Sequence, residues 1–285
     1  MPKIGLVLSG GLAKGAYQLG VLKAINELVR LEDIVAISAS SVGTLNAYAF
    51  INQRLEAAEN IWKTIDCKSM TAFVRHVLQS DFLEKQIDRI ATTSNILCNS
   101  FYTTLLNTTS RSLSYIDLKK VNPSFLKNYI RASVALPPFN KPISIQQTHY
   151  LDGALVDNIP ILPLKSEKLD CIICVYFEDY NYNFENVDLN NKTIKINQQS
   201  NMFMKNVFLF KHEYIEQMIQ DGYVYGKDVL QDFFVNGELL PDYLETIQEY
   251  NQKNSDLKWY VTCEVFTKRL NKVTRKYLDK KRSNR

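Results

Sequence analysis

The chain has 285 residues, of which 46% are apolar and 11% aromatic, which is the composition of an ordinary globular protein with a sizeable core. Five scattered cysteines and the lack of an apolar leader before Ile4 lead us to expect a reducing, cytoplasmic setting, and no run approaches the roughly 18 apolar residues of a membrane-spanning helix, so any contact with lipid should be peripheral. The formal net charge of +4 is unevenly distributed, because nine basic residues and one acidic residue between 268 and 285 give +8 and leave −4 for the rest.

Two strand–turn–helix units open the chain. Residues 4–8 form a short apolar run that ends at Ser9-Gly10-Gly11, and apolar residues with helical spacing follow from Tyr17 to Val29. A second apolar run at 34–37 leads into the small residues 38–43, and a helical stretch continues from about Thr44 to Gln53. This repetition predicts an α/β fold with a parallel sheet that is covered by helices.

The rest of the chain allows a coarser prediction. Residues 55 to about 128 have a mainly helical pattern, and this block either covers the sheet or serves as a lid. Further strands are expected at 129–134, 143–145, 171–177 and 192–196, and helices should fill much of 200–285. Since no repeat, low-complexity tract or linker divides the chain, we expect one domain over residues 1–285.

Ser41 lies in the turn between the second strand and its helix, which is where a serine hydrolase places its nucleophile. The small residues Ala39 and Gly43 on either side allow the helix to pack tightly against the strand that it leaves. The N-terminus of the helix also places partial positive charge near the reacting centre. Small-residue turns of this kind are common, so the turn makes Ser41 a candidate nucleophile and no more.

The glycine turn at Gly10 and Gly11 follows a strand and opens a helix, so its backbone N–H groups can converge on an anion. It is not a Walker A loop, because Lys14 precedes Gly15 and no Ser or Thr follows the lysine, and Leu12 replaces the second glycine of a dinucleotide-binding fingerprint. An oxyanion hole formed by Gly10, Gly11 and Leu12 fits better. The side chain of Leu12 would be strained if that position requires φ > 0. Lys14 either contacts a lipid phosphate or caps its own loop.

A third motif at 150–154 ends a strand-like run with the carboxylate of Asp152, which the flexible Gly153 follows. With these three motifs in this order, the chain resembles the patatin-like phospholipases, whose pattern runs from GGGxKG through GxSxG to Asp-Gly-Gly or Asp-Gly-Ala. The resemblance extends over residues 4 to about 160 and includes the stretch 131–137, Asn158 and Pro160. The chain departs from the pattern where Leu12 interrupts the first motif and where Ala39 replaces the usual glycine of the second.

The resemblance implies a three-layer α/β/α fold with a central, mainly parallel sheet, and hydrolysis of acyl esters in phospholipids or lysophospholipids. By the family's pattern, Ser41 attacks the ester carbonyl and Asp152 takes its proton, as a dyad without histidine. A carboxylate with an ordinary pKa of about 4 is a weak base. The dyad therefore requires a partly desolvated pocket that raises the pKa of Asp152.

Two other functions remain open from the sequence. Ser41, Asp152 and His212 occur in the chain order of an α/β-hydrolase triad, although a nucleophile at position 41 leaves room for only two preceding strands, whereas that fold places several. A patatin-fold protein that binds lipid or a partner without turnover is the second alternative, and Leu12 is what supports it.

No metal and no cofactor are assigned from the sequence. Cys171 and Cys174 have CxxC spacing, but they lie in an apolar strand-like run without a second pair, which indicates buried thiols.

The basic segment at 266–285 predicts an amphipathic C-terminal helix. Its apolar residues are spaced 4, 3 and 4 apart and so share one helical face, at Phe266, Leu270, Val273 and Tyr277. Such a helix suits peripheral contact with an anionic membrane, and the alternative is a docked helix whose basic face is solvated. No recognition motif or aromatic-interleaved basic patch accompanies the charge, so no nucleic-acid partner is expected.

Overall fold

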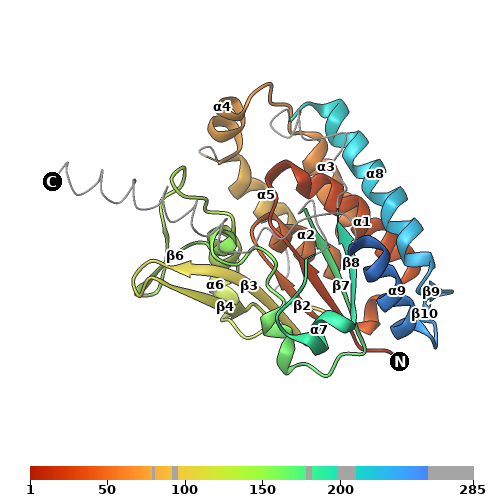
Figure 1. Cartoon of the computed structure of the whole chain (residues 1–285). Coiled ribbons are helices and arrows are strands. Elements are labelled where there is room, and N and C mark those ends of the chain that lie inside the picture. The colour runs from red at the N-terminus through yellow and green to blue at the C-terminus, as the bar shows by residue number, and fades with distance from the viewer. Residues whose placement is uncertain (79–80, 92–95, 178–181, 198–209, 256–285) are drawn as a thin grey trace.

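A computed structural model describes residues 1–78, 81–91, 96–177, 182–197 and 210–255, and an eight-stranded sheet lies at its centre (Figure 1). The strand order is β5-β6-β3-β2-β1-β7-β8, and β4 pairs with β3. The pairs β1–β2, β1–β7, β2–β3 and β7–β8 are parallel, as the two strand–turn–helix units predict. The strands are β1 (Ile4–Leu8), β2 (Ile34–Ala39), β3 (Ser100–Asn107), β4 (Ser112–Asp117), β5 (Ile143–Ile145), β6 (Thr148–Asp152), β7 (Cys171–Tyr176) and β8 (Thr193–Asn197).

Helices and helical turns cover both faces of the sheet, which gives the predicted three layers. Side chains of β1 alternate between the two faces: Leu6 packs in the larger apolar cluster with α1, α2 and α8, and Val7 packs in a smaller one with η5 and α7. The helical elements are η1 (Leu12–Lys14), α1 (Gly15–Leu28), η2 (Leu31–Asp33), α2 (Val42–Ile51), α3 (Leu55–Lys63), α4 (Met70–Phe73), η3 (Val74–Leu78), α5 (Phe82–Ile90), α6 (Pro123–Ser133), η4 (Gly153–Leu155), η5 (Leu162–Ser166), α7 (Val187–Asn191), α8 (His212–Gln231) and α9 (Tyr243–Ser255). A short hairpin of β9 (Phe234–Val235) and β10 (Glu238–Leu239) follows α8.

Two predictions about secondary structure are wrong. Residues 129–134, expected as a strand, form the last part of α6 and the residue after it. That helix has a clear start, because Pro123 occupies its first turn and the side chain of Asn122 accepts a hydrogen bond from Ser124 N at 3.0 Å. The block 55–128, expected to be mainly helical, contains the antiparallel pair β3 and β4. The strands predicted at 143–145, 171–177 and 192–196 are confirmed to within a residue or two.

The predicted basic helix at 266–285 lies outside the described residues, so its contact with a membrane stays a prediction. Among the helices that are described, none has both the length and the apolar character needed to cross a membrane.

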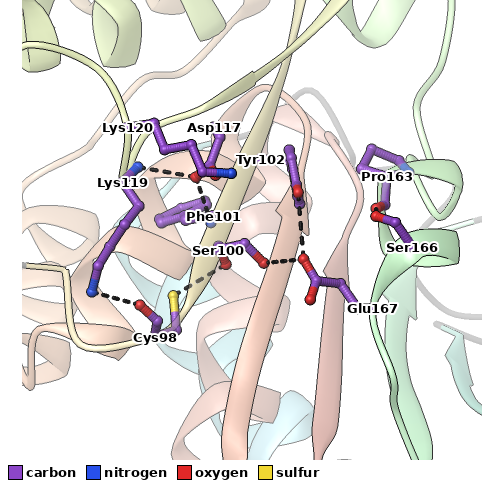
Figure 2. Close-up of polar contacts among 10 residues, drawn as sticks. All are labelled: Cys98, Ser100, Phe101, Tyr102, Asp117, Lys119, Lys120, Pro163, Ser166 and Glu167. Carbon is purple, nitrogen blue, oxygen red and sulfur yellow. Dashed lines mark hydrogen bonds and ion pairs between the residues drawn. The ribbon is translucent and has the colours of Figure 1, made fainter.

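Polar contacts hold the amino end of β3 (Figure 2). Ser100 Oγ donates to Glu167 Oε1 at 2.7 Å, and the hydroxyl of Tyr102 donates to the same oxygen at 3.4 Å. Lys119 Nζ donates to Cys98 O at 2.7 Å, and Asp117 Oδ1 accepts from the backbone N–H of Lys119 at 3.1 Å. These contacts fasten η5 and the turn after β4 to the start of the strand.

Candidate active site

One edge of β3 brings Ser41 and Asp152 together. Along that edge β2 pairs with the first half of β3, and its last residue, Ala39, lies opposite Thr103. The second half of β3 pairs with β6, whose last residue, Asp152, lies opposite Leu105. The other edge is occupied by β4. Because Ser41 follows the end of β2 by two residues and Asp152 is the last residue of β6, both lie beside the middle of β3, and both line one cavity.

Ser41 has a strained backbone in the turn between β2 and α2. Its φ of 53° and ψ of −132° lie outside the regions that non-glycine residues prefer, at a cost on the order of 1–3 kcal/mol. The turn is tight because α2 packs directly on β1: a Cβ at Gly43 would lie 2.6 Å from the carbonyl oxygen of Leu8. Ala39 replaces the glycine of the family pattern, and its methyl group is fully buried in the core. Both small residues thus serve the packing that the sequence predicted for them.

Asp152 is 1% exposed, and burial raises the pKa of its carboxyl to about 7, against the opposing effects of the Ser41 side chain and the Ala154 N–H. Oδ1 accepts from Ala154 N at 2.9 Å. Oδ2 is buried and has no partner at full hydrogen-bond geometry among the described residues. The carboxyl therefore has one anchored oxygen, a second oxygen without a fixed partner, and the raised pKa that a base for serine requires.

Gly10 differs from the other two predicted oxyanion donors. Its N–H already donates to Asn158 Oδ1 at 3.0 Å, and its carbonyl accepts from Asn158 Nδ2 at 3.2 Å. A Cβ at Gly10 would also lie 2.7 Å from Cβ of Ser41. Gly10 thus provides room beside the serine, whereas no hydrogen bond from Gly11 N or Leu12 N is found in the described part of the chain. No pattern in the sequence indicates that Asn158 pairs with this loop.

Leu12 has a φ of 51°, which is the left-handed conformation that a side chain disfavours. Its side chain lines the same cavity as Ser41. Lys14 does not point to a free position: Nζ donates to the carbonyl of Phe177 at 3.2 Å and lies 5.7 Å from the centre of that ring. The partner, Phe177, follows β7 and is not part of the loop at 10–14, so both the capping of that loop by Lys14 and a contact of Lys14 with phosphate stay predictions.

The cavity at Ser41 is apolar over most of its wall. Its polar lining residues are Ser41 and Asp152 at the reacting end, together with Asn46 and Gln86. Residues of α3, η3 and α5, which precede β3, form most of the wall, and residues 134–136 complete it. The sequence pattern predicts that this block either covers the sheet or serves as a lid. The apolar lining side chains are Leu12, Val42, Leu45, Ala58, Ile61, Trp62, Ile65, Phe73, Val77, Leu78, Phe82, Leu83, Ile87, Ile90, Val134 and Leu136.

None of the three histidines lines this cavity. His212 begins α8, where its Nδ1 lies 2.8 Å from the carbonyl oxygen of Lys63. Cys171 and Cys174 are fully buried thiols, as predicted. Within the described ranges, no group of three or more His, Cys, Asp or Glu side chains is placed to hold a metal ion.

The family model of the patatin-like phospholipases (Patatin) matches residues 6–69 and 60–165, which together are more than half of the chain. The chain belongs to the patatin-like phospholipase family. The matched residues include every site residue discussed above, from the glycine turn through Ser41 to Asp152.

Several fungal proteins are similar to this patatin-like chain. Lysophospholipase NTE1 of Cryptococcus neoformans is 26% identical over 192 residues, and the protein of the same name from Candida glabrata is 29% identical over 190 residues. The alignments cover 61% and 60% of this chain but only 11% and 10% of those proteins. The chain thus spans about a tenth of the length of these relatives.

Two solved structures also align with the chain. VipD from Legionella pneumophila is 13% identical with a TM-score of 0.46, over 81% of this chain and 67% of VipD. A chain of the ExoU–SpcU complex from Pseudomonas aeruginosa is 14% identical with a TM-score of 0.42, over 90% of this chain and 58% of that chain.

Proposed function

We propose that this patatin-like chain is a serine-dependent lipid acyl hydrolase that cleaves carboxylic ester bonds of phospholipids or lysophospholipids. The observation that carries the proposal is a serine on a strained turn beside a buried carboxyl of raised pKa, at one end of an apolar cavity. Membership of the patatin-like phospholipase family and the lysophospholipase names of the fungal relatives support lipid as the substrate class.

In the proposed reaction, Ser41 and Asp152 act as a dyad. As Ser41 Oγ bonds to the ester carbonyl carbon, its proton passes to the Asp152 carboxylate and the carbonyl oxygen becomes an oxyanion. When the intermediate collapses, the bond to the leaving oxygen breaks and Asp152 returns the proton to that oxygen. Water then repeats the sequence on the acyl-serine, with Asp152 as base, and releases the fatty acid and free Ser41.

The oxyanion donors in this proposal are the N–H groups of Gly11 and Leu12. The N–H of Gly10 is engaged by Asn158, so Gly10 contributes the close approach of the loop to Ser41. Preorganised backbone donors of this kind are worth about 10²–10³ in kcat each. Leu12 keeps its N–H despite its side chain, and so its presence is compatible with turnover.

The apolar wall of the cavity is proposed to hold the acyl chain. Aliphatic and aromatic side chains from α3, η3 and α5 line it, and such surfaces bind hydrocarbon by removing it from water. The polar headgroup then remains at the open side, near Ser41. We also propose peripheral contact of 266–285 with anionic lipid, for which deletion of 267–285 should weaken vesicle binding and spare hydrolysis of a soluble ester.

Covalent labelling by a fluorophosphonate tests the proposed nucleophile. The probe is expected to modify Ser41, as mapped by mass spectrometry, and both labelling and lysophospholipid hydrolysis should vanish in Ser41→Ala. Ser100→Ala is the matched control, since Ser100 also donates to a carboxylate but lies outside the cavity. A wild-type protein that binds lipid vesicles but is neither labelled nor active would support the binding protein without turnover instead.

A further inference from the structure

A buried chain of amide hydrogen bonds ties the oxyanion loop to the helix that follows Ser41. Asn46 Nδ2 donates to Gly15 O at 2.8 Å and to Gln18 Oε1 at 3.0 Å. Gln18 Nε2 in turn donates to Ser9 O at 3.0 Å. Ser9 and Gly15 are the residues that flank the loop at 10–14, so one side chain of α2 fixes both ends of that loop, directly at Gly15 and through Gln18 at Ser9.

The same amide reaches the wall of the acyl cavity. Trp62 Nε1 on α3 donates to Asn46 Oδ1 at 3.1 Å, and Trp62 and Asn46 both line the cavity. The indole also packs on the loop, because a Cβ at Gly15 would lie 2.6 Å from Trp62 Cζ2. Asn46 is 2% and Gln18 0% exposed, so these bonds are shielded from water, and a buried amide that loses its partners is costly.

The loop needs such an external constraint because its own backbone is strained. Leu12 has a φ of 51° without being glycine, and a released loop would relax away from that conformation. An oxyanion donor that moves by a fraction of an ångström loses most of its catalytic value. Asn46 lies in the second turn of α2, the helix that Ser41 caps, so it can set the loop at a fixed distance from Ser41.

We infer that Asn46 is a positioning residue for ester hydrolysis, which holds the N–H groups of Gly11 and Leu12 in register with Ser41. This inference rests on the function proposed above. Gln18 carries the constraint to the start of the loop, and Trp62 connects it to the wall that contacts the acyl chain. Asn46 itself touches neither the reacting atoms nor the Asp152 carboxyl.

The test replaces Asn46 with aspartate, which has nearly the same shape but presents an acceptor to the oxygens of Gly15 and Gln18. With a soluble short-chain ester, kcat of Asn46→Asp should fall by about 10- to 100-fold while KM changes by less than about twofold, since only the oxyanion donors are displaced. The rate of fluorophosphonate labelling should fall by a similar factor, because phosphonylation uses the same donors.

Thr103→Val is the matched control. It breaks another buried side-chain bond of α2, the 2.8 Å contact between Thr103 Oγ1 and Thr44 Oγ1, without touching the loop. Its kcat should stay within about twofold of wild type. If Asn46→Asp keeps the kcat of Thr103→Val, or raises KM alone, the inference is wrong.

Gln18→Met covers the case in which Asn46→Asp does not fold. It releases the Ser9 end of the loop and leaves the bond between Asn46 and Gly15, so kcat should fall by about 3- to 10-fold at constant KM. An unchanged kcat in this folded variant would also overturn the inference. Failure of the proposed function gives a different result, because the wild type would then be neither labelled nor active, or Ser41→Ala would keep the activity of the wild type, whatever the Asn46 and Gln18 variants do.

Discussion

Two pairs of a serine and a carboxyl group lie along β3, and they differ in backbone, burial and surroundings. At the amino end of β3, Ser100 is an ordinary strand residue opposite Ala36, and its hydroxyl donates at 2.7 Å to a half-buried Glu167 (Figure 2). Beside the middle of β3, Ser41 lies on a strained turn, and Asp152 is buried at a cavity with a glycine loop nearby.

The comparison shows that a serine paired with a carboxylate is not in itself an active site. The pair at Ser100 fastens η5 to β3 and does not line the cavity at Ser41. The pair at Ser41 has three additional features: a strained backbone at the serine, burial that raises the pKa of the carboxyl, and the close approach of the loop at Gly10. The variants below separate these contributions, in order of expected effect.

Replacing the two carboxyls tests the chemical difference directly. Asp152→Asn should lower kcat/KM for a lysophospholipid by about 10³-fold or more, because the amide cannot accept the serine proton. Glu167→Gln should leave kcat/KM within about twofold of the wild-type value. Circular dichroism and thermal melts should show both variants folded. Comparable losses in the two variants would mean that Asp152 acts through stability alone.

The pH dependence tests the effect of burial on the carboxyl. Since burial raises the pKa of Asp152 to about 7, kcat/KM should rise about tenfold per pH unit below that value and level off above it. The same shift makes Asp152 stabilise the fold fully below pH of about 4, and this stabilisation is lost as pH rises through about 7. A kcat/KM profile with its midpoint near pH 4 would contradict a desolvated base.

Glycine substitutions test the backbone difference. Ser41→Gly should raise the free energy of unfolding by about 1 kcal/mol, because glycine adopts a φ of 53° without strain. Ser100→Gly should lower it by roughly 1 kcal/mol, because a strand residue loses its hydrogen bond to Glu167 and gains freedom in the unfolded chain. Urea denaturation measures both, and equal signs would argue against strain at Ser41.

The smallest effect is expected at His212, the residue that a triad would require. Its ring lies at the start of α8 against Lys63 and lines no part of the cavity, so His212→Ala should keep kcat/KM within about twofold. Assay of the folded variant with the same ester decides between dyad and triad. Loss of activity comparable to that of Ser41→Ala would restore the histidine mechanism.

The parallel half of the fold was predictable because its signals are local. Each of the first two strands is a short apolar run that ends in small residues, and helical spacing follows at once. The antiparallel pair of β3 and β4 was not predicted, because β3 is paired along both edges and largely buried, and lacks the alternation that marks a half-exposed strand. The end of α6 was assigned as a strand although Asn122-Pro123 marks a helix start.

The parts of the site that lie within short sequence motifs could be predicted from the sequence. The sequence identified Ser41 and Asp152 as partners through a family resemblance, and it anticipated strain at Leu12, which the φ of 51° confirms. The pairing of Gly10 with Asn158 and the network of Asn46 escaped it, because side-chain hydrogen bonds between distant segments leave no periodic trace. The cavity at Ser41 was not predicted, because it depends on the packing of α3, η3 and α5, which no short motif encodes.

Because β2 and then β6 pair along one edge of β3, the position of the serine and the carboxyl is determined separately from the shape of the cavity. Sheet register sets the position of Asp152 relative to Ser41, and a slip of one residue in β6 would turn the carboxyl to the opposite face of the sheet. The helices between β2 and β3 carry no such constraint. They can be lengthened, shortened or repacked, which would reshape the wall of the cavity, while Ser41 and Asp152 keep their places.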